Sequence, residues 1–186
     1  MASLRTLRAL LLCVALCGGP TALPAAAPSA TEQQVKAVFV FNFSHFVEWP
    51  QQAFPSPTSA FIIGVLGGEQ VAEQLEVAVR GEHVGQHPLQ VRRLQGIGDI
   101  GDCHILYIDK VASAQLGDIL AALTGRHTLT VSDLDGASQR GVMIQLATDS
   151  NRVHLLINVD SARAAGLTIS SNLLRPAQIV RAAGAP

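Results

Sequence analysis

The sequence predicts a layered α/β domain, with helices covering a mostly parallel central sheet that ends in an antiparallel C-terminal hairpin. Two observations support this prediction. Short apolar runs typical of strands alternate with amphipathic helical segments, which is the pattern of βαβ units. Two further strand-like runs, VMIQLA and NRVHLLINVD, are joined by the polar turn Thr148-Asp149-Ser150-Asn151, which predicts a hairpin.

The chain opens with the features of an export signal. Two arginines precede the short apolar run Ala9 to Leu16, and small residues at 25–27 offer a signal-peptidase site. The apolar run is too short to span a bilayer. We therefore predict a cleaved signal peptide over residues 1–27, with Ala30 as the alternative cleavage site. A single domain over 28–186, located in the periplasm, is expected to follow.

The first helix is predicted to begin after Thr31. Thr31 and Gln34 have the spacing of a capping box. Apolar residues then recur at helical spacing and form one stripe: Val35, Val38, Phe39, Phe43, Phe46 and Val47. Val40 and Phe41 widen this stripe beyond that of an ordinary surface helix, and Pro50 is expected to stop the helix.

The central elements follow in alternation. FIIGVL is predicted as a strand, and Gly67-Gly68 leads from it into the helix EQVAEQLEVAVR. After the loop GEHVGQHP, PLQVRRL is the second strand. CHILYID is the third, and its nearly continuous apolar character predicts burial on both faces. ASAQLGDILAAL is then a helix and HTLTVSD the fourth strand. A last helical segment begins near Ser161 and is broken near Gly166 and Pro176.

Charge and cysteine content exclude several classes of function. Without the signal peptide, eleven basic and fourteen acidic side chains remain, a net charge of −3. The chain has neither the basic patch of a nucleic-acid-binding protein nor a Lys/Arg-rich amphipathic helix for anionic lipid. Cys103 is the one cysteine after residue 27, so no internal disulfide is expected. Its apolar surroundings favour a buried thiol over a redox sensor or an intermolecular disulfide.

The Rossmann-like order of elements prompts a search for catalytic and cofactor motifs. GVLGG lacks the G-x-G-x-x-G order, no P-loop lysine follows it, and no G-x-S-x-G is present. His83 and His87 lie among Gly and Pro, which favours solvated loop histidines over zinc ligands. Ser132-Asp133 ends a strand, where α/β proteins bind ligands, but a turn cap is the favoured interpretation. We predict no catalytic residues, metal or cofactor, and a binding module rather than an enzyme.

Four stretches together resemble the YfiR-like family of periplasmic proteins (DUF4154). They are VKAVFVFNFSHFVEWP, CHILYID, LTVSD followed by GVMIQL, and NRVHLLINVDSARAAGLTISSNLLR. The resemblance spans residues 35–181 in the family's order. It implies a Rossmann-like three-layer domain, a homodimer, and a repressor that binds the periplasmic sensor domain of an inner-membrane diguanylate cyclase. Repression would lower cyclic-di-GMP and biofilm output, and an outer-membrane lipoprotein would draw the repressor away.

The chain departs from the family pattern at three positions. Val142 stands where the family usually has a second Gly, which indicates a different turn. Pro176 replaces a helix-compatible residue, so we expect the last helix to kink or end early. Cys103 lacks the partner cysteine of disulfide-stabilised relatives, which excludes redox control through an internal bridge.

Partner binding is assigned to the first helix and the closing segment. Trp and other aromatic residues often anchor interfaces. The candidate residues are Phe41, Trp49, Leu167, Ile169, Leu173 and Leu174. The other interpretation is core packing, which we favour for Trp49. Two other functions remain as alternatives: a periplasmic small-molecule-binding accessory protein of another membrane sensor, such as a histidine kinase, and an enzyme.

Overall fold

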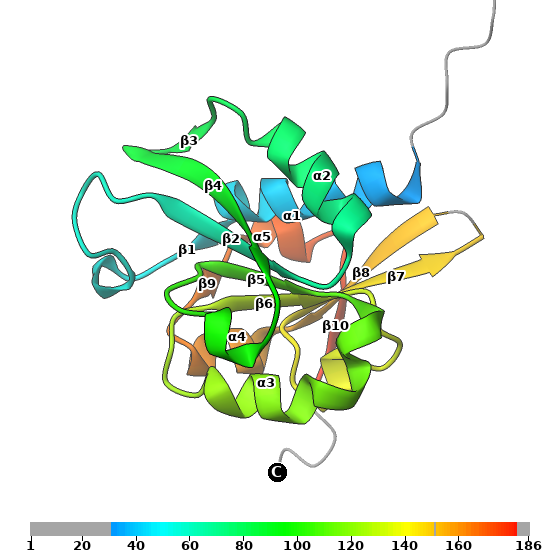
Figure 1. Cartoon of the computed structure of the whole chain (residues 1–186). Helices are drawn as coiled ribbons and strands as arrows, with labels where there is room; N and C mark the ends of the chain where they lie inside the picture. The colour runs from blue at the N-terminus through cyan, green and yellow to red at the C-terminus, as the bar shows by residue number, and fades with distance from the viewer. Residues whose placement is uncertain (1–30, 151, 182–186) are drawn as a thin grey trace, which may run out of the picture.

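An eight-stranded sheet runs through the computed structural model, which describes residues 31–150 and 152–181 (Figure 1). Its order is β10-β8-β7-β6-β5-β2-β4-β3. The strands are β2 (Phe61–Leu66), β3 (His83–Val84), β4 (His87–Leu94), β5 (Ile105–Ile108), β6 (Leu129–Ser132), β7 (Ile144–Asp149), β8 (Arg152–Asn158) and β10 (Gln178–Val180). The predicted signal peptide lies outside the described residues.

The strand directions confirm the predicted fold class. β2 pairs in parallel with β4 and β5, and β5, β6 and β7 continue the parallel series. β7 and β8 form the predicted antiparallel hairpin, and β10 adds to β8 in parallel. At the other edge, β3 pairs antiparallel with the start of β4.

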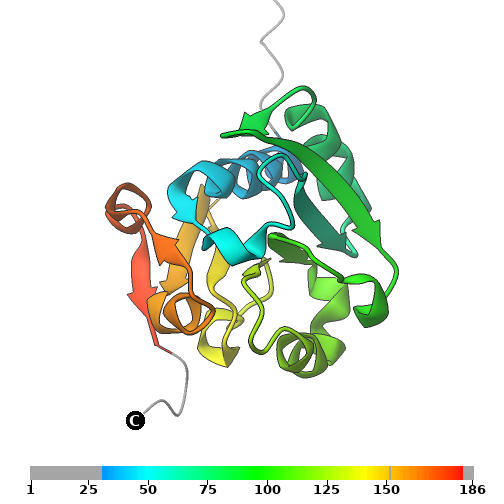
Figure 2. The same ribbon diagram turned by 90° about the vertical axis from the view of Figure 1, so that its left-hand side faces the viewer.

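Helices cover both faces of the sheet. α1 (Glu32–Phe46) and α2 (Glu69–Ala78) lie together on one face, and α3 (Leu116–Ala122) lies on the other, as Figures 1 and 2 show. The C-terminal segment adds the short helices α4 (Val159–Ala164) and α5 (Ser171–Leu174). A second, two-stranded sheet is formed by β1 (Val47–Glu48) and β9 (Thr168–Ile169).

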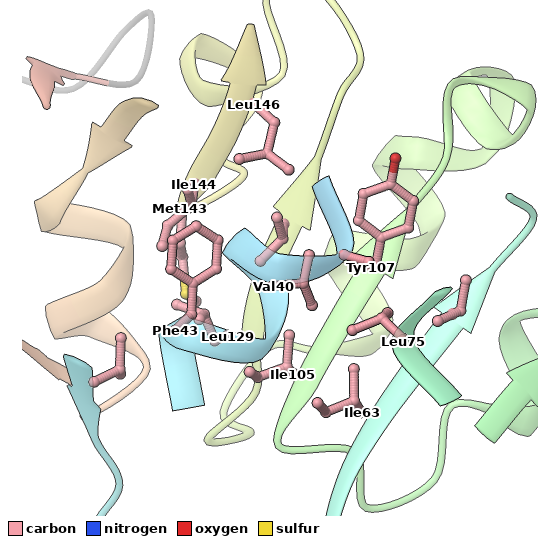
Figure 3. Packing of buried hydrophobic residues seen from close by; sticks show 14 of the residues in the cluster. Val40, Phe43, Ile63, Leu75, Ile105, Tyr107, Leu129, Met143, Ile144 and Leu146 are labelled. Atoms are coloured by element: carbon pink, nitrogen blue, oxygen red, sulfur yellow. The ribbon is translucent and has the colours of Figure 1, made fainter. Parts of the chain in front are cut away.

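Alternate residues of the central strands face two apolar clusters, because successive side chains of a strand point to opposite faces. The cluster under α1 and α2 takes the odd-numbered residues of β2 and β5: Phe61, Ile63, Val65, Ile105 and Tyr107. The cluster on the α3 side takes even-numbered ones: Leu66, Leu106 and Ile108. Figure 3 shows Val40 and Phe43 of α1 packed over the first cluster. This two-sided burial is the reason CHILYID is almost entirely apolar.

Helix α1 begins as predicted but buries a different face. Its capping box is confirmed, with Thr31 N donating to Gln34 Oε1 (2.8 Å) and Gln34 N to Thr31 Oγ1 (3.2 Å). The buried residues are Lys36, Ala37, Val40, Phe43 and Ser44, whereas Val38 is 50% exposed. The predicted stripe is therefore partly wrong. The helix carries more apolar residues than one face can hold, so hydrophobicity alone did not fix its rotation.

Short strands account for the other differences from the predicted elements. α1 ends at Phe46, four residues before Pro50, because the chain turns into β1. The predicted loop GEHVGQHP contains β3 and the start of β4, and the predicted last helical segment contains β9 and β10. Strands of two or three residues are too short to show a periodic pattern. The early end expected at Pro176 is confirmed, since α5 ends at Leu174.

Cys103 is a buried, free thiol, as the apolar context indicated. It is 3% exposed, and burial raises the pKa of the thiol to about 11. Its Sγ packs directly against the backbone of β2. A Cβ added at Gly64 would lie 2.6 Å from Cys103 Sγ and 3.0 Å from Leu94 Cδ1. Gly64 therefore provides the space in which the thiol packs.

Replacing Gly64 by Ala should destabilise the protein by about 1–3 kcal/mol, because the added methyl group overpacks the α3-side cluster. Urea unfolding measures this free energy. Gly117→Ala is the matched control, since no atom lies within 4 Å of its added Cβ. It should be neutral or slightly stabilising in helix α3. A Gly64→Ala protein as stable as the unmodified one would contradict this packing.

Candidate functional site

The two segments predicted to bind a partner lie side by side. β1 follows α1 directly and pairs antiparallel with β9, with Val47 opposite Ile169 and Glu48 opposite Thr168. A hydrogen bond from Ser170 N to Phe46 O (2.8 Å) extends this contact. The end of the first helix and the closing segment thus form one continuous part of the molecule. We call this region the β1–β9 junction.

The six predicted partner-binding residues differ in burial. Three are packed into the core and are 2%, 9% and 6% exposed: Leu167, Ile169 and Leu173. In this structure β9 and α5 fold back onto the core, so these three side chains contribute to core packing. The other three are half-buried at the margin of the same core: Phe41, Trp49 and Leu174.

Phe41 keeps part of its ring at the surface of α1. It meets His45, one turn later, edge-to-face, with ring centroids 5.2 Å apart and planes at 85°. His45 is itself exposed. Such a half-exposed aromatic pair on a helix that is anchored at both ends provides a rigid contact surface.

Trp49 is held by contacts inside the molecule. Its Nε1 donates a hydrogen bond to His104 O (3.2 Å), and its ring meets Phe61 at 90° with centroids 4.8 Å apart. Phe61 is fully buried. These contacts support the core-packing interpretation of Trp49 and leave Phe41 and Leu174 as the better candidates for contact with a partner.

His104 belongs to an aromatic stack beside Trp49. Its ring stacks on both Phe54 and Phe61, at centroid distances of 4.6 and 4.7 Å, and these two rings are themselves 6.3 Å apart. Its Nδ1 accepts a hydrogen bond from Ile62 N (3.0 Å), and its buried Nε2 has no partner among the described residues. Burial lowers the pKa of His104 to about 4. The ring is therefore neutral near pH 7.

A crevice lies at the carboxyl ends of the parallel strands. The chain runs from β2 to β4 on one side and returns to β5 on the other side of β2, so the order of connections reverses between β2 and β5. Open α/β sheets bind ligands at this reversal. A cavity of about 290 Å³ is found there. Residues from the starts of α1 and α2 and from the loops after β5 and β6 line it.

A buried ion pair forms one wall of this crevice. Lys36 Nζ lies 2.6 Å from Asp133 Oδ2 and 2.7 Å from Glu32 Oε1, and the side chains of Lys36 and Asp133 are only 6% and 5% exposed. Burial by itself would lower the pKa of Lys36, but its hydrogen bonds to Asp133 and Glu32 outweigh this and raise the pKa. Lys36 is therefore charged near pH 7, and its contact with Asp133 ties α1 to the end of β6.

The role predicted for Asp133 was wrong. The turn after β6 is capped by Ser132, whose Oγ donates to Ile108 O (2.7 Å) and accepts from Leu134 N (3.1 Å). Asp133 instead accepts from Lys36 through Oδ2 and from Lys110 N through Oδ1 (3.2 Å). Lys36 lies 97 residues away in sequence. No local pattern could have revealed this partner.

Tyr107 places a hydroxyl group beneath the crevice. The residue is fully buried on β5, and its hydroxyl has no hydrogen-bond partner among the described residues. Figure 3 shows the hydroxyl directed away from the apolar side chains around the ring. Burial raises the pKa of Tyr107, and the nearby charges of Asp133 and Asp109 raise it further. Tyr107 is therefore a neutral hydroxyl that makes no hydrogen bond of ordinary geometry, although the Asp133 carboxylate is near enough to favour its protonated form.

The remaining candidates for chemistry are dispersed. His83 is exposed, and His87 stacks on Phe54 at 4.0 Å. Glu48, the residue before Trp49, is exposed. Within residues 31–150 and 152–181, no three His, Cys, Asp or Glu side chains are grouped to hold a metal ion. In the same ranges, no helix has both the length and the apolar character needed to cross a membrane.

Comparison with known proteins identifies the family. A family model described as YfiR/HmsC-like (DUF4154) matches residues 33–178. Because this match covers most of the chain, the chain belongs to the YfiR/HmsC-like family. None of the curated proteins matches the sequence.

Two solved structures share the fold at low sequence identity. A conserved domain protein of Vibrio cholerae O1 biovar eltor str. N16961 is 14% identical with a TM-score of 0.54, and the match covers 80% of this chain and 60% of that one. The ABC domain of Streptococcus pneumonia, solved in complex with L-Trp, is 10% identical with a TM-score of 0.50. That match covers 64% of this chain and 55% of that one. The chain thus spans little more than half of these structures, and the likeness concerns the fold alone.

Removing one partner of the buried ion pair should strongly lower the stability of the protein, whereas removing both charges should not. Lys36→Met leaves Asp133 buried without a counter-charge, so we expect about 3–5 kcal/mol of destabilisation. The double variant Lys36→Met/Asp133→Leu should recover most of that loss, because apolar side chains can replace a buried ion pair. Urea unfolding of both variants tests this. If the single and double variants were equally unstable, the unpaired charge of Asp133 would not be the cause of the lost stability.

Stability should fall as the pH is lowered from about 6.5 towards 4. In this window the unfolded chain binds a proton at His104 that the folded protein does not bind, so unfolding becomes more favourable. The difference between the ordinary pKa of histidine and a pKa of about 4 corresponds to roughly 3 kcal/mol in total.

The free energy of unfolding, measured between pH 7 and 5, tests this effect in a range where most carboxylates do not titrate. His104→Gln keeps an acceptor for Ile62 N, and it should flatten the pH dependence. His154→Gln, at an exposed position of β8, should not. An unchanged slope in His104→Gln would assign the effect to other groups.

Proposed function

We propose that this protein is a periplasmic regulator that represses an inner-membrane diguanylate cyclase by binding its periplasmic sensor domain. Repression lowers cyclic-di-GMP and, with it, biofilm output. The observation that carries this proposal is the match to the YfiR/HmsC-like family over residues 33–178, a family of regulatory domains rather than a known family of enzymes. The protein then acts by mass action between binding partners and needs no cofactor.

The β1–β9 junction supports binding as the mode of action. It presents the half-buried Phe41 and Leu174 on elements fixed by backbone hydrogen bonds. A surface ordered before binding loses less conformational entropy on association. We propose that the sensor domain docks here, that the working unit is a homodimer, and that an outer-membrane lipoprotein competes for the repressor.

A second candidate function rests on the crevice between β2 and β5. The cavity of about 290 Å³ at the reversal of strand order favours a small-molecule-binding accessory protein of another membrane sensor, such as a histidine kinase. The two functions differ in their output, because only the first changes cyclic-di-GMP when the gene is lost.

Intracellular cyclic-di-GMP, measured in cells with and without the gene, tests the proposed function. Complementing versions with and without residues 1–27 provide the control for export. The proposal requires a rise on loss of the gene that only the exported form reverses. An unchanged level would remove the cyclase from the proposal.

Variants at the junction should separate binding from folding. Phe41→Ala and Leu174→Ala should each weaken binding to the purified sensor domain by about tenfold or more, as truncation of an interface anchor does. Trp49→Ala should instead destabilise the fold by about 3 kcal/mol, because it removes a large ring from its packing site. Isothermal calorimetry and urea unfolding measure the two effects.

Val77→Ala, which is 62% exposed on α2, is the control for both measurements and should change neither. A stable Trp49→Ala protein that no longer binds, together with normal binding by Phe41→Ala, would reverse these assignments.

A further inference from the structure

Two buried polar atoms without hydrogen-bond partners gather at the crevice between β2 and β5. They are Gln33 Oε1 and the Tyr107 hydroxyl oxygen, Oη; one other such atom, His104 Nε2, is found among the described residues. Gln33 lines the cavity, and the Tyr107 ring lies directly behind it, with Cε1 3.2 Å from the place of a Cβ on the lining residue Gly68. Buried polar atoms nearly always have a hydrogen-bond partner. Two such atoms without one, beside the same cavity, therefore indicate that a ligand could supply the missing hydrogen bonds.

In the loop after β2, two glycines allow the Asp109 carboxylate to lie close to the backbone. Gly67 and Gly68 both have positive φ, at 73° and 64°. A Cβ on Gly68 would lie 2.9 Å from Asp109 Oδ2. Asp109 Oδ1 accepts from Val111 N (2.9 Å), whereas Oδ2 has no hydrogen bond among the described residues. A third acceptor is therefore free at the same cavity.

The charge of the cavity wall favours a cationic ligand. Four carboxylates line it and two ammonium groups oppose them: Glu32, Glu69, Asp109 and Asp133 against Lys36 and Lys110. The Lys36 charge is already engaged by Asp133 and Glu32. The N-terminus of α2 would attract an anion, but Glu69 occupies its first turn. Glu69 is itself paired with Arg93 (Nη1 to Oε2, 2.6 Å), so Asp109 is the carboxylate of the cavity wall that makes no ion pair among the described residues.

We propose that this crevice binds a small organic cation, an aliphatic primary ammonium compound. Its three N–H groups would donate to Tyr107 Oη, Gln33 Oε1 and Asp109 Oδ2, three oxygens that accept no hydrogen bond of ordinary geometry among the described residues. Val111, which is 75% exposed and packs over Gly67 at the rim, offers an apolar contact to the alkyl chain. Gln33 Oε1 and Tyr107 Oη are closed to solvent, so binding requires the half-buried Gln33 side chain to turn.

The crevice is separate from the surface proposed to bind the membrane partner. The crevice adjoins the first residues of α1, whereas the β1–β9 junction follows its last residue. A helix of fifteen residues separates the two sites by about 22 Å.

Butylamine and butyrate, which have the same alkyl chain and opposite charge, are suitable probes. We expect butylamine to raise the thermal midpoint of the protein and to bind saturably by calorimetry, and butyrate to do neither. Stabilisation by butyrate alone would identify an anion site at α2 instead. No response to either probe would overturn the proposal.

Two variants test whether butylamine binds in this crevice. Tyr107→Phe removes a hydroxyl that has no partner, and Asp109→Asn keeps the Oδ1 bond to Val111 N while removing the charge. Each should leave folding intact and weaken butylamine binding at least tenfold. Asp118→Asn, at an exposed position of α3, is the matched control. Equal binding by all three variants would place the amine elsewhere, and the cyclic-di-GMP measurement would be unaffected by that result.

Discussion

The buried ion pair between Lys36 and Asp133 ties the first helix to the end of β6. A buried pair adds little net stability, but removing one partner is costly because it leaves a buried charge unpaired. We infer that this requirement helps to set the rotation of α1, which turns Val40 and Phe43 into the core and leaves Val38 exposed. The same rotation sets Phe41 at the margin of the core and Gln33 at the crevice. Both candidate sites are therefore linked to the position of this one helix.

Helix α1 physically connects the two sites. Its first turn lines the crevice, and its last residue leads into the strand that pairs with β9. A ligand in the crevice changes partner affinity only if it binds two arrangements of α1 with different affinities. The polar contacts at the start of the helix provide a group of interactions that such a ligand would replace, since Glu32 bonds both Lys36 and Thr148.

Much of the fold was predictable because its signals are local. The apolar runs of β2 and β5, the capping box at Thr31 and the polar turn of the hairpin each follow from a few adjacent residues. The candidate sites were harder to predict from the sequence. Lys36 and Asp133 are far apart in sequence, Tyr107 is hidden within an apolar strand, and β1 and β9 have only two residues each. The position of Asp133 at a strand end was a usable clue, but a local turn explained it equally well.

We propose that the protein regulates a membrane cyclase by direct contact through the surface that includes Phe41 of α1. Photo-crosslinking in intact cells tests it most directly, with a photoreactive amino acid at position 41 and, as control, at position 77 on the exposed side of α2. The account predicts a crosslink from position 41 to the periplasmic domain of an inner-membrane diguanylate cyclase, and none from position 77. Crosslinking that is absent, or equal from the two positions, would contradict it.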